Sequence, residues 1–274
     1  MNYFDLKISI INKNIMVSYA LELQTVQASA FRILVEALKE ILTDANFEFD
    51  ESGMKIVAMD SSHTVLVHLK LNSENFENYS CKSSKLILGI NMINLYKLMK
   101  IMGNNDTLSL KVEEEDLSTL HIIIENSEKN SLTRFKLNLM DLTEENIQIP
   151  PPSFESVITM PSIDFQKICR DMHNLAEEIE IKSIGSQLIF SCKGQFATQE
   201  TCIGSSSNGL NFIQNEEDKI VQGIYALKHL VLFSKCTNLC NSVELYLKND
   251  FPLIIKYSVA SLGEIKLCLA PKYD

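Results

Sequence analysis

The sequence predicts an α+β protein of two similar domains, each built from a pair of strand–helix–strand–strand–strand units, with an extended connector between the domains. The main observation is that the same order of strand and helix patterns occurs four times, twice on each side of the midpoint, which indicates an internal repeat. A second is the run Pro150–Pro152 near the midpoint, since proline fits neither a helix interior nor a central strand. The length of 274 residues also suffices for two ordinary domains.

These patterns predict four segments of the chain. We expect an N-terminal extension over residues 1–20, a first domain over 21–137, a connector over 138–154 and a second domain over 155–274. Proline also favours an extended conformation in the residue that precedes it, so residues 147–152 should form a stiff surface segment.

In the first domain, residues 21–27 alternate apolar and polar side chains and should form a strand. Ser29 should cap a helix whose apolar residues from Phe31 to Leu42 fall on one face. A second helix is expected over residues 92–102, with Gly103 at its C-terminal cap. The other predicted strands of this half are 47–49, 54–59, 64–71, 85–90, 107–112, 121–124 and 133–137.

The second domain repeats this pattern. Pro161 and Ser162 should begin a helix that ends near Leu175, and a fourth helix is expected over residues 226–236. The predicted strands of this half are 156–160, 178–182, 187–192, 195–203, one that leads to Tyr225, 243–248, 253–259 and 264–269.

Composition excludes several classes of protein. No segment approaches 18 uninterrupted apolar residues, so we expect no membrane-spanning helix. The seven cysteines are scattered and include no C-x-x-C pair, so they predict free thiols rather than a metal site. The five histidines also lack a metal-binding spacing. We therefore expect neither a metal nor another cofactor.

The sequence contains no convincing catalytic arrangement. Ser62 and His63 are neighbours, but adjacent side chains of an extended chain point to opposite faces, so one is not placed to deprotonate the other. The segment Gly204–Gly209 has the glycine spacing of a phosphate-binding loop, but Leu210 and Asn211 follow where that motif requires lysine and then serine or threonine. We expect a protein that is not an enzyme.

The distribution of charge is more informative than the total. A net charge of −10 by itself argues against binding nucleic acid. The four predicted helices, however, carry eight basic and only four acidic residues, and each helix holds one basic pair on one side. If the helices line one surface, it is a basic track of the kind that binds a phosphate backbone without reading bases. The eight residues are Arg32, Lys39, Lys97, Lys100, Lys167, Arg170, Lys228 and Lys235.

The connector is unusually apolar for a surface segment. It carries Leu139, Met140, Leu142, Ile147 and Ile149. These side chains either pack on the chain's own domains or contact a partner, and the residues alone leave both readings open.

Four short motifs match one family. Met59–His63 reads Met-Asp-Ser-Ser-His, Leu139–Leu142 reads Leu-Met-Asp-Leu, Ile168–Asp171 reads Ile-Cys-Arg-Asp, and Leu269–Lys272 reads Leu-Ala-Pro-Lys. In these motifs and their order the chain resembles the eukaryotic-type DNA sliding clamp, proliferating cell nuclear antigen, from about residue 21 to residue 274. The resemblance implies two sliding-clamp (DNA clamp) domains per chain and a ring of three chains. Helices would line a hole around duplex DNA, and sheets would form the rim.

The resemblance also implies three sets of functional residues. The DNA-facing positions match the eight basic residues named above. The partner-peptide pocket matches Met59, His63, Thr64, Leu139, Asp141, Leu142, Ile147, Ile149, Pro150, Phe154, Pro252, Ala270, Pro271 and Lys272. The interface of the trimer, in which residues 133–137 pair with 196–203 of the next copy, matches Ile101, Phe135, Leu137, Met172, Leu175 and Phe196.

Three positions depart from the pattern of the family. Gly185 stands where a modifiable lysine is common, Thr64 replaces an apolar pocket residue, and Cys268 stands where an aromatic residue is usual. The peptide preference and the modification of this chain can therefore differ from those of its family.

The function implied by the resemblance is that of a homotrimeric clamp in DNA replication and repair. It would confer processivity on DNA polymerase and bind polymerase, clamp loader, flap nuclease and ligase through peptide motifs, either in the nucleus or at the site of viral DNA replication. Two alternatives are a subunit of a checkpoint-type heterotrimer and a monomeric processivity factor that holds DNA by charge alone. The mass in solution separates these alternatives.

Overall fold

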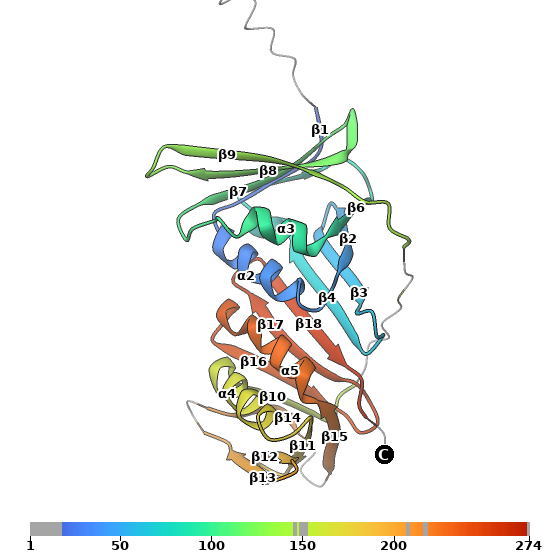
Figure 1. The fold of residues 1–274 in the computed structure, drawn as a ribbon, viewed down its shortest axis with the longest axis vertical. Helices are drawn as coiled ribbons and strands as arrows, with labels where there is room; N and C mark the ends of the chain where they lie inside the picture. Colours follow the sequence, from blue (N-terminus) through green and yellow to red (C-terminus); the bar gives the residue numbers. More distant parts are fainter. Residues whose placement is uncertain (1–17, 145–146, 148–152, 207–208, 216–218, 273–274) are drawn as a thin grey trace, which may run out of the picture.

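The computed structural model describes residues 18–144, 147, 153–206, 209–215 and 219–272. Among these residues, four α-helices form one layer that lies in front of the strands in Figure 1 and follows the long axis in the order α3, α2, α5, α4. Their bounds are α2 Ala28–Leu38, α3 Met92–Met99, α4 Ser162–His173 and α5 Leu227–Phe233, which the 3₁₀ helix η2 continues over Ser234–Leu239.

In the part of the chain that the structure describes, the strands form three antiparallel sheets. The strands of the first half are β1 Tyr19–Thr25, β2 Asp44–Asp50, β3 Gly53–Met59, β4 Val65–Asn72, β5 Asn78–Cys81, β6 Leu86–Asn91, β7 Thr107–Glu113, β8 Asp116–Asn126 and β9 Ser131–Asn138. Those of the second half are β10 Ser156–Pro161, β11 Glu178–Ile184, β12 Gln187–Lys193, β13 Thr198–Gly204, β14 Asn211–Asn215, β15 Ile220–Ala226, β16 Ser242–Leu247, β17 Leu253–Val259 and β18 Gly263–Leu269. A short 3₁₀ helix, η1 Ser73–Asn75, lies between β4 and β5.

The predicted repeat is present four times. The units are β1-α2-β2-β3-β4, β6-α3-β7-β8-β9, β10-α4-β11-β12-β13 and β15-α5-β16-β17-β18. In each half, the first strand of one unit joins the sheet formed by the last three strands of the other unit, as β1 does beside β7 and β10 beside β16. This exchange makes one body of two units and confirms the predicted α+β fold class.

Burial along the strands explains why these segments form sheets under helices. In β2 and β7, every second residue is buried, which is the period of a strand with one covered face. The buried side chains of β2 are Ala45, Phe47 and Phe49, and they belong to the same core as Phe31 and Leu38 on α2. Full burial of such a side chain stabilises the fold by about 1.5–3 kcal/mol.

The two halves are joined by strand pairing as well as by the connector. β4 of the first half pairs with β18 of the second, from Val65 opposite Leu269 to Leu71 opposite Gly263. The result is one sheet of nine strands, in the order β14-β10-β16-β17-β18-β4-β3-β2-β6. We call the β4–β18 seam the internal joint. Among the six strands that end these sheets are β9 of the five-stranded sheet and β13 of the four-stranded sheet, which we call the free edges.

Several predicted boundaries were wrong. Helix α2 follows Gln27 rather than a cap at Ser29, and it ends at Leu38. Helix α3 ends at Met99 with Lys100 as its right-handed C-cap, so Gly103 does not cap it. Strands β5 and β14 were not predicted, because both lie at sheet edges, where alternation of apolar and polar residues is weak. Within the described residues, no helix has the length and apolar character needed to traverse a bilayer.

Candidate functional site

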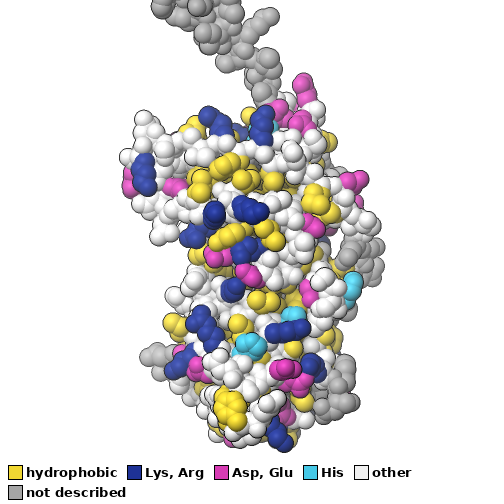
Figure 2. All heavy atoms as spheres, in the orientation of Figure 1, with side chains coloured by type: hydrophobic (Ala, Val, Ile, Leu, Met, Phe, Trp, Pro, Cys, Tyr) yellow, Lys and Arg dark blue, Asp and Glu magenta, His cyan; other side chains and the backbone are white. Residues whose placement is uncertain are grey.

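The helix layer presents most of the predicted basic residues to solvent. Lys97, Lys100, Lys167, Arg170, Lys228 and Lys235 are exposed, whereas Arg32 and Lys39 are half-buried. Figure 2 shows Lys and Arg side chains recurring along this face from one end of the molecule to the other, with fewer Asp and Glu side chains among them. We call this surface the helix face. It can offer cations to phosphate groups along its whole length.

The eight basic residues are not equally free to bind a ligand. The Arg32 guanidinium lies 3.9 Å from the Glu36 carboxylate. Lys39 stands over the Tyr96 ring, with Nζ 4.7 Å from its centroid, and also bonds to Glu40. In contrast, Lys97, Lys100, Lys167, Arg170 and Lys228 have no ion pair to any described residue. These five residues are the strongest candidates for contacts with phosphate.

A second site forms where the connector lies against the first domain. The main-chain NH of Met140 donates to the Gly89 carbonyl at 2.8 Å, and that of Leu139 donates to the Ser118 carbonyl at 2.8 Å. Leu142 and Met59 then line one hollow of about 220 Å³, together with residues of β2 and β3. Two of the predicted pocket residues, far apart in the sequence, are therefore brought together.

The turn that contains the Met59–His63 motif is held by one carboxylate. Asp60 Oδ1 accepts hydrogen bonds from the main-chain NH groups of Thr64 and Val65, both at 2.8 Å, and Asp60 Oδ2 accepts one from the Ser62 hydroxyl. Burial alone would raise the pKa of Asp60, but these hydrogen bonds to the carboxylate outweigh it and lower the pKa below its ordinary value. Because Asp60 engages the Ser62 hydroxyl, the motif is a shaped turn. It presents His63, with a left-handed φ of 54°, at the surface.

The C-terminal motif closes over the same region. The main-chain NH of Ala270 donates to the Thr64 carbonyl at 3.0 Å, and that of Lys272 donates to the Ile224 carbonyl at 2.8 Å. The Lys272 ammonium is bound by Glu178. The C-terminal motif thus connects the Met59–His63 turn to the second domain, and Pro271 between these bonds is half-buried.

Phe154 packs on the second domain. Its ring meets those of Tyr246 and Phe251 edge-on, at centroid distances of 5.1 and 5.9 Å. Pro252 is half-buried beside Phe251 in the chain. The remaining predicted pocket residues are less constrained: Asp141 is exposed and Ile147 half-buried, while Ile149 and Pro150 lie outside the described residues.

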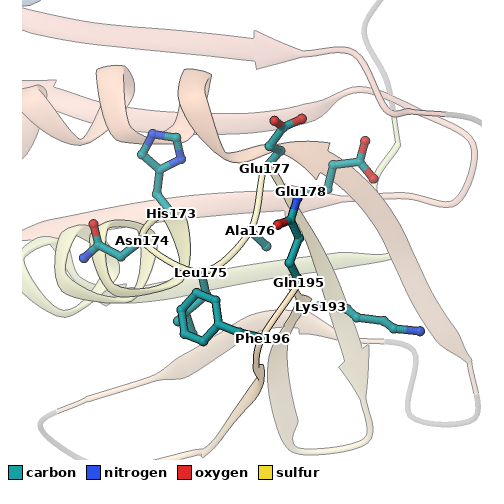
Figure 3. A pocket seen from close by; sticks show the side chains of 10 residues that line it. His173, Asn174, Leu175, Ala176, Glu177, Glu178, Lys193, Gln195 and Phe196 are labelled. Atoms are coloured by element: carbon teal, nitrogen blue, oxygen red, sulfur yellow. The ribbon is translucent and has the colours of Figure 1, made fainter.

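Two residues of the predicted interface are exposed apolar side chains. Phe196, just before β13 in the second domain, is 78% exposed, and Ile101, just after α3 in the first domain, is 52% exposed. Phe196 and Leu175 line a hollow of about 690 Å³, and Figure 3 shows the Phe196 ring standing on the side of its turn where Leu175 lies. Gly194 permits this arrangement, because a Cβ there would come within 1.9 Å of the Leu175 carbonyl oxygen. Phe135 and Leu137 on β9 are half-buried.

Met172 departs from the predicted interface set. Its side chain is fully buried in the core of its own chain, so it has no surface to offer to a second copy. Helical periodicity indicated a buried face at this position, but it does not distinguish burial in the chain's own core from burial by a partner.

The described residues contain no group of three or more His, Cys, Asp or Glu side chains arranged to hold a metal ion. All seven cysteines are free thiols, and Cys169, Cys192, Cys236 and Cys268 are buried. Burial raises the pKa of Cys268 to about 11 and that of Cys236 to about 12, which keeps both as protonated thiols at neutral pH.

Comparison with known proteins matches the whole described fold. The family model for the N-terminal domain of proliferating cell nuclear antigen matches residues 20–146, and the model for its C-terminal domain matches residues 148–272. The "Probable DNA polymerase sliding clamp 1" of Paramecium bursaria Chlorella virus 1 is 37% identical over 253 residues, which cover 91% of this chain and 95% of the viral protein. Two repeated domains with helices on one face define a clamp subunit. The chain belongs to the proliferating cell nuclear antigen family of DNA sliding clamps.

Sequence reasoning missed several residues that shape these sites. Glu40 binds both Lys39 and Lys235, and so lowers the charge that the helix face offers. Gly89 seats the connector, because a Cβ there would lie 2.2 Å from the Met140 carbonyl oxygen. An isolated glycine within a strand pattern, such as Gly89 in residues 85–90, signals such a close approach and could have revealed it.

Proposed function

We propose that three copies of this chain close into a ring around duplex DNA, and that the ring confers processivity on DNA polymerase and recruits replication and repair proteins. The helix face would line the hole, and the sheets would form the rim. The connector hollow beside Met59 and Leu142 would receive peptide segments of polymerase, clamp loader, flap nuclease and ligase. The chain itself would catalyse no reaction, and it would act in the nucleus or at the site of viral DNA replication.

The observation that carries this proposal is the contrast between the internal joint and the two free edges. At the internal joint, the core-facing residues Leu69, Leu71 and Leu267 are fully buried. The matching residues on the free edges, among them Phe135 and Leu137 on β9 and Thr201 on β13, are only half-buried. A second copy that pairs its β13 with this β9 would give these residues the cover that the internal joint already has.

Phe196 shows the largest difference in burial between the internal joint and a free edge. It lies five residues before Thr201, the central core-facing residue of β13, just as Leu262 lies five residues before Leu267 on β18. Leu262 is fully buried and its carbonyl accepts a hydrogen bond from Asn72 of the first domain, whereas Phe196 is 78% exposed. A phenylalanine so exposed, at a position whose counterpart in the other unit of the second domain is buried, favours a partner in that place.

Mass in solution and retention on DNA test this proposal. Light scattering should give about 93 kDa, three times the chain mass of 31.0 kDa. The loaded ring should remain on closed circular DNA in 1 M salt and leave once the circle is linearised, since encirclement does not depend on charge. A monomer at micromolar concentration would contradict the ring and favour the monomeric processivity factor. A trimer that forms only with other clamp subunits would favour the checkpoint type.

A further inference from the structure

We propose that copies of this chain join in one strand register, in which Arg134 on β9 lies directly opposite Glu200 on β13 of the next copy, and that this ion pair selects like copies. The inference rests on the ring of the proposed function. It adds the register of the joint and the residues that choose the partner.

The register follows from the internal repeat. In the second domain, we count from the second buried residue of the strand that follows each helix, Ile181 on β11 and Leu245 on β16. Ile181 pairs with Phe190 and Phe190 with Thr201, just as Leu245 pairs with Ile255 and Ile255 with Leu267. Thr201 on β13 therefore occupies the place that Leu267 holds on β18.

The same pairing scheme applies to the first domain. In one unit, Leu110 on β7 pairs with Ile122 on β8, and Ile122 pairs with Phe135 on β9. In the other unit, Phe49 pairs with Met54, so the preceding core residue, Phe47, lies level with Ile56, and Ile56 pairs with Leu69 on β4. Phe135 therefore occupies the place that Leu69 holds.

The internal joint then fixes the external one. Leu69 lies opposite Ile265 and Val67 opposite Leu267. If β9 pairs with β13 of the next copy in the same register, Phe135 lies opposite Gln199 of that copy and Thr133 lies opposite Thr201. On the outer face of the sheet, Arg134 then lies opposite Glu200, and Leu132 opposite Cys202. All four outer residues are exposed in the single chain.

Charge agrees with this register. The outer face of β9 offers Arg134 and Lys136, and no acid, to the neighbouring copy. Next to the β13 edge, Glu178, Glu180 and Glu200 line one hollow of about 490 Å³ together with Lys193. Glu178 is paired with Lys272 and Glu180 with Lys182, whereas Glu200 has no ion pair to a described residue. An arginine placed opposite Glu200 would supply that carboxylate with planar donors.

At the matching position of the internal joint, His68 lies opposite Lys266, and an attractive pair, Lys70 opposite Glu264, lies two residues further along. The connector also tethers these two strands within one chain. Joints between separate copies have no such tether, and opposite charges across a strand pair help to fix which strands meet. We infer that the Arg134–Glu200 pair supplies this choice.

A disulfide cross-link between copies tests the proposed register of β9 with β13 directly. Leu132→Cys places a thiol opposite the native Cys202, at a Cβ separation of about 4.5–5.5 Å, close to what a disulfide needs. Diamide, which takes up two hydrogens per disulfide formed, should convert this variant to covalent dimers and trimers on a non-reducing gel. Cys202→Ser in the same background should abolish them. Thr133→Cys, which faces the other side of the strand, is the matched control and should not cross-link.

The results separate the register from the ring. A 93-kDa particle in which Arg134→Cys cross-links to Cys202 and Leu132→Cys does not would overturn the register and leave the ring intact. A monomeric mass for the unmodified chain would instead overturn the proposed function.

Charge reversal tests the selecting role. Arg134→Glu should raise the concentration at which the trimer dissociates by about ten-fold or more, since like charges directly opposite repel. Adding Glu200→Arg should restore assembly. The two single variants, mixed, should form joints preferentially between unlike chains. If Arg134→Glu assembles as the unmodified chain does, or if the double variant shows no rescue, Arg134 and Glu200 do not select the partner.

Discussion

Glu40 Oε1 lies 3.2 Å from Lys235 Nζ and also accepts a hydrogen bond from Lys39 Nζ, so one carboxylate holds two cations of the helix face. The bond from Lys39 lowers the pKa of Glu40 most; burial opposes it, and Lys235 lowers the pKa further. Glu40 is therefore ionised at neutral pH. Because Lys39 follows α2 and Lys235 lies in η2, this acid sits where the two halves meet and reduces the charge available there.

Replacing Glu40 by glutamine should strengthen binding to duplex DNA. The change releases two ammonium groups, so log K should fall with log salt more steeply by about 1–2 units of slope. Fluorescence anisotropy with a linear duplex at several salt concentrations measures both quantities. Glu125→Gln, at an exposed position of β8, is the control and should change the slope less. Equal slopes for the two variants would show that Glu40 does not mask the lysines.

The unpaired lysines should contribute more to DNA binding than the paired ones. Lys97→Ala with Lys100→Ala should reduce affinity for every duplex sequence and lower the salt slope by about 2. Lys39→Ala with Lys235→Ala should do so less, because Glu40 already neutralises part of that charge. Affinity that depends strongly on base sequence would contradict a helix face that contacts only the backbone.

The seat of the connector should control peptide binding. Gly89→Ala should push the backbone near Met140 away, and Leu142→Ala should remove part of the hollow beside Met59. Each should lower affinity for a glutamine-led, double-aromatic peptide about ten-fold, equivalent to roughly 1.4 kcal/mol. Calorimetry measures the affinity, and Leu117→Ala at an exposed hairpin is the control. The solution mass should be unchanged, and normal affinity in both variants would place the peptide elsewhere.

Phe196→Asp should break the joint between copies. The repeat places Phe196 where Leu262 is buried, so a partner would bury an unpaired carboxylate there, at a cost that favours separation. Sedimentation should show monomers at micromolar concentration. Ile213→Asp, at a position 63% exposed on β14, should still assemble. Full assembly of the Phe196 variant would show that this ring lies outside the joint.

The internal joint should weaken in mild acid. Burial first, and then Lys266 opposite and Lys55, lower the pKa of His68, while Glu264 raises it less. The folded chain therefore binds the proton less readily than the unfolded chain, and stability falls as pH falls below about 6.5. Urea unfolding at pH 7.5 and 5.5 should show this loss, and His68→Gln should reduce it. An unchanged pH dependence in this variant would assign the loss to other groups, such as His229.

The order of elements could be predicted because the spacing of apolar residues changes clearly within each unit, from every second residue in strands to about every 3.6 residues in helices. Residues 92–102 and 162–175 gave helices within a few residues of the observed bounds. Cap positions were less predictable. Gln27 precedes α2 without a side-chain cap bond, so tertiary packing rather than cap chemistry sets where that helix begins.

The sites were predictable only where residue type carried the signal. Basic residues on helices stand out in an acidic chain, but their pairing with Glu36 and Glu40 depends on rotamers and on the fold. Nothing in the sequence singles out Arg134 or Glu200. Their proposed pairing depends on the observed register of β4 with β18, which the sequence does not reveal. For Met172, helical periodicity correctly indicates a buried side chain, but it does not say whether the chain's own core or a partner buries it.

The pairing of β4 with β18 has a consequence for how such a ring can come apart. Because both strands belong to one chain, dilution cannot separate them, and the connector keeps their effective concentration in the millimolar range even when the pairing breaks for a moment. In the proposed ring, the seams between β9 of one copy and β13 of the next would have no such tether and would follow mass action. Such a ring of six domains would have three seams within chains and three between chains. Passage of DNA into the hole would then require one seam between chains to open while the other two act as hinges.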